Sequence, residues 1–143
     1  MIMFDELNKY KNNNHFFFSA DQSLASVCNT PKNICGVYVV FALTRGKVVL
    51  VYIGSSGKMQ KDGKIRIRKG GLYDRIVNGK QFDGPRRISW PDKMKAENIE
   101  ALDIYWYDTF NNKTLDIPAY IEAKLLQKHF EVTGFLPEWN EEF

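Results

Sequence analysis

The stretch VYIGSSGK, residues 51–58, ends a run of apolar β-forming residues in glycine, two serines and a lysine. Such a sequence brings hydroxyl and ammonium donors to the end of a strand, where a phosphate is the group that suits them best. The stretch does not fit a P-loop, because the first glycine of that motif would stand at Tyr52 and Met59 replaces the Ser or Thr after Lys58. Binding of a nucleotide phosphate through this loop stays an alternative.

Glu122 is the second residue with a chemical implication. Four apolar residues of the segment 119–133 recur at helical spacing: Ala119, Ala123, Leu126 and Phe130. Glu122 stands on or beside that stripe, where an unpaired carboxylate is costly. We therefore expect a compensating arginine, hydroxyl or metal ion, unless the carboxylate reaches water at the edge of the stripe.

Basic residues are concentrated in one part of the chain. The formal net charge is +3, but ten basic and only three acidic residues fall in the segment 58–87. A local positive field on a nearly neutral protein indicates a polyanionic partner, although a solvated lysine-rich loop would look the same. The expected contacts to a nucleic-acid backbone come from Ser55, Lys58, Arg66, Arg68, Lys69 and Lys80.

The composition limits the class of protein. With 143 residues, of which 44% are hydrophobic, the chain suits one compact domain. No apolar run approaches the roughly 20 residues of a membrane span, and the N-terminus has no secretory pattern. Cys28 and Cys35 form neither a disulfide framework nor a zinc motif. We expect a cytoplasmic protein without a membrane partner.

The clearest structural signal is a β-hairpin. The runs 36–43 and 47–54 flank the loop 44–46, whose last residue is a glycine, as is common in three-residue hairpin connections. In that register Tyr38 lies directly opposite Tyr52, and both side chains share one face of the sheet.

The other elements complete an α/β (α+β) domain with a three-stranded, mainly antiparallel sheet flanked by helices. They are a helical N-terminal arm (1–33), a ribbon in the basic segment, a short helix (71–79), a third strand (101–108) and a final helix. Thr114 or Asp116 is expected to cap the final helix, Pro118 lies in its first turn, and Gly134 ends it. The domain proper is predicted over 34–143, with the basic insertion at about 58–87.

Two triplets of the hairpin resemble the signature of a known family. GVY (36–38) and YIG (52–54) on adjacent strands are similar to the paired motif of the GIY-YIG nucleases. The family pattern continues with an arginine on the next helix, a glutamate on a later helix and an asparagine near the end. Residues that match these positions are Arg75, Glu122 and Asn140. The resemblance spans about residues 34–140 and implies the GIY-YIG fold.

The resemblance also implies a function: a metal-dependent endonuclease that hydrolyses DNA phosphodiester bonds. Glu122 would hold one divalent ion, Mg²⁺ or Mn²⁺, which needs few protein carboxylates. Tyr52 would act as general base or orient the attacking water, and Tyr38 would position the water or the phosphate. Arg75 would clamp the scissile phosphate, while Asn140 would hydrogen-bond near the site.

The sequence departs from the family pattern at Gly79. Some members carry a histidine or tyrosine there, one turn after the arginine, and Lys58, Lys69 or Lys80 could replace it. Two alternatives stay open: a catalytically silent DNA-binding domain of the same fold, or residues that are merely structural, with an ordinary tyrosine pair and an Arg75–Glu122 ion pair. Cutting both strands of DNA at one metal site would need a dimer or two successive events.

Overall fold

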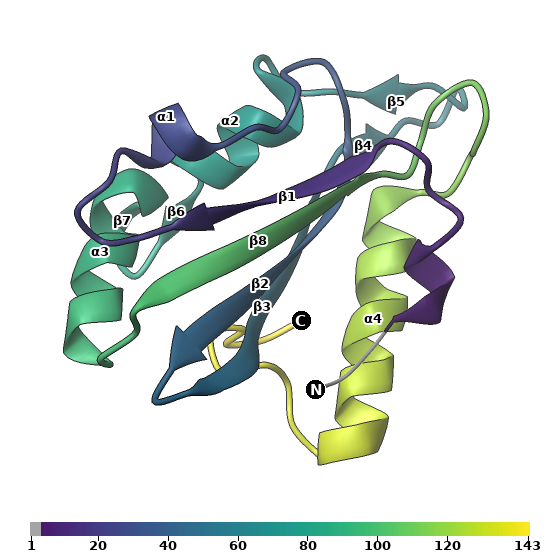
Figure 1. Ribbon diagram of the computed structural model, residues 1–143. Helices are drawn as coiled ribbons and strands as arrows, with labels where there is room; N and C mark the ends of the chain where they lie inside the picture. The colour runs from purple at the N-terminus through teal and green to yellow at the C-terminus, as the bar shows by residue number, and fades with distance from the viewer. Residues whose placement is uncertain (1–3) are drawn as a thin grey trace.

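The structure, a computed structural model, describes residues 4–143. Four strands form one antiparallel sheet in the order β1-β8-β2-β3 (Figure 1). They are β1 (Asn13–Phe18), β2 (Gly36–Thr44), β3 (Lys47–Ser56) and β8 (Ala101–Asp108). The prediction of a mixed α and β domain with an antiparallel sheet is confirmed, whereas the predicted number of three strands is wrong.

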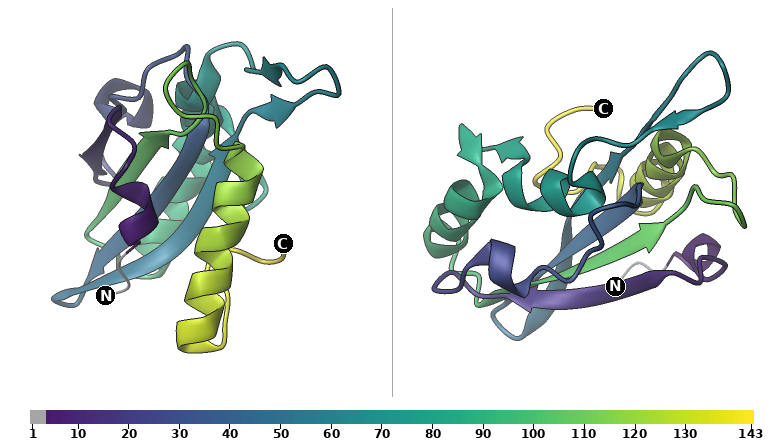
Figure 2. Two further views of the ribbon diagram at one scale, coloured as in Figure 1. Left: turned by 90° about the vertical axis from the view of Figure 1, so that its right-hand side faces the viewer. Right: turned by 90° about the horizontal axis from the view of Figure 1, so that it is seen from above.

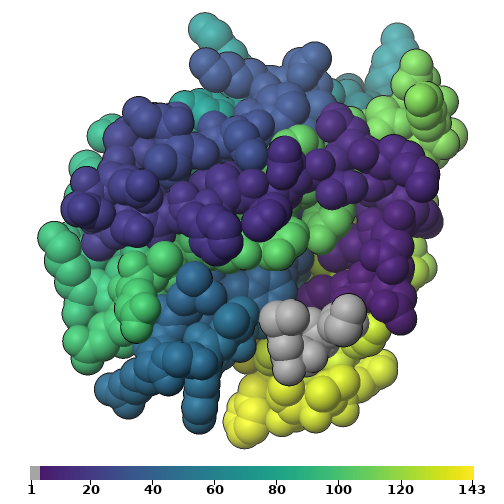
Figure 3. Space-filling model, in the orientation of Figure 1, coloured from purple at the N-terminus to yellow at the C-terminus, as the bar shows by residue number. Residues whose placement is uncertain are grey.

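The additional strand, β1, lies in the segment predicted to be a helical arm. Phe16 and Phe18 are buried while Phe17 between them is exposed, so the run of three phenylalanines alternates across the sheet. In the described part of this arm, residues 4–33, the helical elements are the 3-10 helix η1 (Asp5–Leu7) and the single turn α1 (Leu24–Val27). Figure 3 shows the purple N-terminal segment lying along β8 (green) at the surface.

The hairpin of β2 and β3 has a shorter loop than predicted. Thr44 pairs with Lys47, and both loop residues have positive φ, 52° at Arg45 and 73° at Gly46, as a two-residue type I′ turn requires. The shorter loop moves the register by one residue, which alone would turn the side chain of Tyr52 to the wrong face.

A β-bulge restores the face. It leaves Val51 unpaired between Leu50 and Tyr52, so that Tyr52 lies opposite Val40 and Tyr38 opposite Gly54. The two tyrosines are therefore diagonal neighbours on one face, with ring centroids 5.9 Å apart. The predicted proximity is confirmed and the predicted direct pairing is wrong.

Helices cover both faces of the sheet (Figures 1 and 2). On one face, α2 (Gly71–Asn78) and α3 (Arg86–Ala96) contribute Leu72, Ile76, Trp90 and Met94 to the larger core. On the other face, α4 (Pro118–Thr133) contributes Ile121, Leu125 and Leu126 to a second core. The strand 101–108 and the helix 71–79 are confirmed as β8 and α2, whereas α3 has no counterpart among the predicted elements.

The final helix begins at Pro118 and ends at Gly134, whose φ of 81° is typical of a glycine C-cap. Neither predicted cap is used, since Ile117 holds the N-cap position without a side-chain bond. The predicted apolar stripe is also wrong except at Leu126, because the helix turns another face inward and leaves Phe130 half-exposed. No helix within residues 4–143 is long and apolar enough to cross a membrane.

The basic segment contains two small ribbons, of which the first fits the predicted excursion. β4 (Lys58–Met59) pairs with β5 (Ile65–Arg66), and β6 (Lys80–Gln81) pairs with β7 (Gly84–Pro85). In Figure 2 the ribbon of β4 and β5 projects beyond the body of the domain.

Candidate functional site

A polar cavity of about 530 Å³ lies beside β3, between α2, α4 and the ribbon of β4 and β5. These elements are far apart in the chain, yet they bring most of the predicted residues together. The cavity is lined by Tyr52, Ser55, Lys58, Arg66, Arg68, Arg75 and Glu122, among others. A second cavity of about 250 Å³ shares Tyr52 and Glu122 with it and adds Lys80 and Asn140.

The two tyrosines are positioned by the bulged hairpin and by Gly54. Tyr38 is fully buried and its hydroxyl has no hydrogen-bond partner within residues 4–143. A Cβ added at Gly54 would lie 2.6 Å from that hydroxyl oxygen and 2.8 Å from Cε2 of Tyr52, so only glycine lets both rings approach. Burial raises the pKa of Tyr52 to about 12, against the opposing effect of the guanidinium groups of Arg86 and Arg75.

Arg75 projects from α2 into the same cavity. Its Nε is buried without a hydrogen-bond partner, and no ion pair joins its guanidinium to a carboxylate among the residues that the structure describes. The structural ion pair between Arg75 and Glu122 is therefore not formed. A cation with free donors and a separate carboxylate face one cavity.

Glu122 lies beside the buried Ile121 on α4 and is half-buried. Burial raises the pKa of its carboxyl group, while a hydrogen bond donated by Ser55 Oγ and the charge of Arg75 act in the opposite direction. Within residues 4–143 no three His, Cys, Asp or Glu side chains cluster. One carboxylate, one hydroxyl and an open cavity that admits water fit the hydrated Mg²⁺ ion, which is usually bound through one or two carboxylates.

Asn140 joins the C-terminal tail to the outer edge of β3 by hydrogen bonds. Its Nδ2 donates to the carbonyl of Ile53, and its Oδ1 accepts from the amide of Ile53, both at 3.0 Å. The amide of Trp139 donates to the carbonyl of Val51 at 2.8 Å. The tail therefore holds both neighbours of Tyr52 in place, which is a positioning role for Asn140.

Arg86, which was not singled out from the sequence, packs against both tyrosines and lines neither polar cavity. It is 1% exposed and lies over the rings of Tyr38, Tyr52 and Trp90, with Cζ between 5.1 and 5.3 Å from each centroid. Its Nη1 donates to the carbonyl of Arg75 at 2.8 Å, at the end of α2, where the helix dipole favours a cation. Within residues 4–143 no carboxylate forms an ion pair with it.

Gly79 makes room for this buried guanidinium. A Cβ there would lie 2.7 Å from Nη1 of Arg86. The glycine that departs from the family pattern is thus the residue that admits Arg86. The glycine at this position was the available signal that another group fills the space, although nothing in the sequence distinguishes Arg86 from the other nine basic residues of the segment 58–87.

The predicted phosphate contacts do not share one environment. Lys58 and Arg66 are exposed opposite each other on the ribbon, whereas Arg68 is paired with Asp74 at 2.7 Å. Of the three lysines that could replace the residue missing at Gly79, Lys58 and Lys80 line the cavities and Lys69 lines neither.

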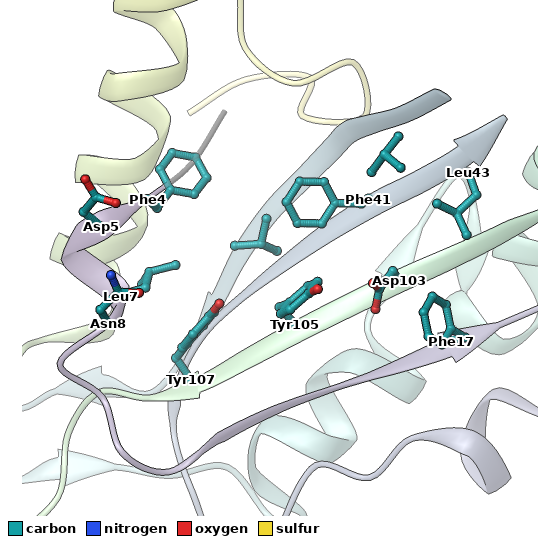
Figure 4. Close-up of a pocket in the computed structure, with 12 residues that line it drawn as sticks. Phe4, Asp5, Leu7, Asn8, Phe17, Phe41, Leu43, Asp103, Tyr105 and Tyr107 are labelled. Carbon is teal, nitrogen blue, oxygen red and sulfur yellow. The ribbon is translucent and has the colours of Figure 1, made fainter. Parts of the chain in front are cut away.

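A third cavity, of about 570 Å³, lies over the sheet face that α4 partly covers (Figure 4). Phe41, Tyr105 and Tyr107 point into it from β2 and β8, and η1 closes one end. Its lining is mostly apolar and holds none of the predicted site residues.

Comparison of the chain with protein-family models, with curated proteins and with solved structures finds no match.

Proposed function

We propose that this chain is a metal-dependent endonuclease of the GIY-YIG type that hydrolyses DNA phosphodiester bonds in the polar cavity. One observation carries the proposal: Arg75 and Glu122 line the same cavity without pairing with each other. Tyr38 lines neither polar cavity, but its ring lies beside that of Tyr52, and its buried hydroxyl has no partner within residues 4–143. Leaving such groups unpaired costs free energy, so they are expected where a ligand completes them. Within residues 4–143, Glu6 Oε1 and Asp108 Oδ1 also lack partners, but each lies away from this cavity.

The phosphate is the ligand that best matches the cavity wall. The guanidinium of Arg75 donates in the fork geometry that suits phosphate oxygens. Lys58 and Arg66 extend the positive surface from the cavity along the ribbon. A strand of DNA that follows this surface brings a phosphate to Arg75, where charge that develops during hydrolysis is stabilised.

Glu122 and the hydroxyl of Ser55 are the groups that would hold a divalent cation, Mg²⁺ or Mn²⁺. When bound, the cation supplies positive charge that offsets the charge developing on the phosphate. Tyr52 takes a proton from the attacking water or orients it, and the hydroxyl of Tyr38 hydrogen-bonds the water or a phosphate oxygen. The guanidinium of Arg86 packs against both tyrosine rings and holds them in place, and its positive charge favours the phenolate of Tyr52.

The test is cleavage of supercoiled plasmid and of labelled single-stranded, duplex and branched DNA, with Mg²⁺ or Mn²⁺ and with chelator. Products that need the metal and disappear in Glu122→Gln support the proposal. The absence of cleavage by a folded protein under all these conditions refutes it.

A DNA-binding domain without catalysis is the second candidate. Burial raises the pKa of Tyr52 to about 12, which works against its use as a general base. Binding of DNA with retained affinity, but without metal-dependent products, would identify this candidate.

A further inference from the structure

The ribbon of β4 and β5 has two different faces. Lys58 pairs with Arg66 and Met59 pairs with Ile65, and the amide of Gln60 donates to the carbonyl of Lys64 at 2.9 Å. Since side chains alternate along a strand, one face presents four long polar side chains. These are Lys58, Gln60, Lys64 and Arg66, all exposed. Met59 and Ile65 on the other face are half-buried.

The tip of the ribbon is built as a defined turn. Gly63, with φ of 83°, donates from its amide to the carbonyl of Gln60 at 3.0 Å. The amide of Lys64 donates to Oδ1 of Asp62 at 3.0 Å. The acid at the tip is therefore used to fix the turn, and the polar face is held in one orientation before any partner binds.

The base of the ribbon belongs to the candidate site, because Lys58 and Arg66 line the same cavity as Tyr52 and Glu122. The tip lies away from it, since the strand rises about 7 Å from Lys58 to Gln60 before the turn at residues 61–63. A ribbon of this size fits the major groove of B-form DNA, which is about 12 Å wide and 8.5 Å deep. The minor groove, about 6 Å wide, does not admit it.

We infer that the ribbon of β4 and β5 enters the major groove of a DNA duplex, where Gln60 and Lys64 read base edges while Lys58 and Arg66 bind the phosphates beside the cavity. Gln60 and Lys64 suit contacts to bases, since in the major groove lysine hydrogen-bonds guanine and glutamine hydrogen-bonds adenine. The inference deepens the proposed function, because it makes duplex DNA the substrate and assigns an element that selects sequence.

The experiment measures binding of the full-length chain to a fluorescein-labelled duplex by anisotropy in chelator, so that no cleavage is required. One duplex has ordinary cytosines, and its matched partner carries glucosylated hydroxymethylcytosine, which fills the major groove. We expect the glucosylated duplex to bind at least about tenfold more weakly, the size expected for lost base contacts. Netropsin, which occupies the minor groove, should not displace the protein.

Variants assign the effect to the ribbon. Gln60→Ala with Lys64→Ala should weaken binding to the ordinary duplex about tenfold and remove the sensitivity to glucosylation. Lys61→Ala removes one charge at the same tip from outside the polar face and should keep that sensitivity. Lys58→Ala and Arg66→Ala should each reduce the slope of log affinity against log salt by about one. All these side chains are exposed, and circular dichroism verifies that the variants fold.

Equal affinity for the two duplexes, displacement by netropsin, or binding of single strands alone would overturn the inference. Its failure is distinguishable from failure of the proposed function. Cleavage without dependence on the major groove keeps the nuclease and removes the reading ribbon. Groove-dependent binding without any cleavage keeps the ribbon and removes the nuclease.

Discussion

Two cavities have nearly equal volumes, about 530 Å³ for the polar cavity and 570 Å³ for the apolar one, but different contents. In the apolar cavity the carboxylate of Asp103 is already held by Nδ1 of His15 at 2.7 Å. In the polar cavity, Glu122 and Arg75 are not paired with each other. Volume therefore does not distinguish the two cavities, whereas an arginine and a glutamate that are not paired with each other do.

The largest effect on the rate of DNA cleavage is expected for Glu122→Gln in the polar cavity. Among the described residues Glu122 is the only carboxylate that lines the polar cavity, and its loss should reduce cleavage about a thousandfold or more, because a bound cation contributes several kcal/mol. Quenched-flow or gel-based cleavage rates measure this. Glu131→Gln, on the exposed side of the same helix, is the matched control and should cleave at the wild-type rate.

The same variant separates function from folding. Burial raises the pKa of Glu122 in the folded protein above its unfolded value, so its contribution to stability is present at low pH and is lost as pH rises through the folded pKa. In chelator at neutral pH, Glu122→Gln should therefore melt at a higher temperature than the wild type. A lower melting temperature would show that the carboxylate is a structural group.

Arg75→Lys should have the next largest effect. The charge is retained, but the fork that binds two phosphate oxygens is lost, and we expect a decrease in cleavage rate of about a hundredfold. Since Nε of Arg75 has no protein partner within the described residues, the melting temperature should change little. A large fall in melting temperature would contradict this assignment.

Tyr52→Phe should reduce cleavage by about a hundredfold, within the range of general acid–base catalysis. Because burial raises the pKa of Tyr52 to about 12, the wild-type rate under single-turnover conditions should rise with pH across the neutral range, with a limit of about tenfold per unit. The variant should lose this dependence. A flat wild-type profile would exclude Tyr52 as the base.

Arg86→Met tests whether the buried cation serves the site or the fold. A buried charge without a carboxylate partner costs free energy, and methionine removes this cost but loses the hydrogen bonds to Gln81 and to the carbonyl of Arg75, so the melting temperature should change little. Cleavage should nevertheless fall about tenfold, since the charge that favours the phenolate of Tyr52 is gone. Parallel loss of stability and activity would make Arg86 a structural residue.

The smallest effect is expected in the apolar cavity. Val48 lines it and is 46% exposed, so Val48→Gln should alter neither cleavage nor binding of DNA. The same plasmid assay measures this variant beside Glu122→Gln. A comparable loss of cleavage would remove the contrast between the two cavities.

Local signals explain which elements the sequence predicted correctly. The hairpin, β8 and α2 have dense β-forming runs or flanking glycines, and Gly134 marks the end of α4. β1 was missed because an edge strand of asparagines and phenylalanines is specified by its pairing with β8. α3 was missed because Pro91 interrupts it, although Trp90 and Met94 have helical spacing.

The site was predicted unevenly for a related reason. That Tyr52, Arg75 and Glu122 lie around one cavity could be predicted, because their order along the chain resembles the family pattern. Arg86 could not, because its burial depends on Gly79 and on a ring cage assembled from three elements. The bulge at Val51 was equally hidden, since the two-residue turn and the extra residue together move the register by two positions and so leave Tyr52 on the same face as Tyr38.

The most direct test of the central claim is the position of Mn²⁺ by anomalous scattering from crystals of the chain soaked in manganese. We predict one peak at coordination distance from the carboxylate of Glu122, inside the polar cavity, and its loss in Glu122→Gln. Manganese bound only elsewhere, or none at Glu122 in crystals where the cavity is open to solvent, would contradict the account.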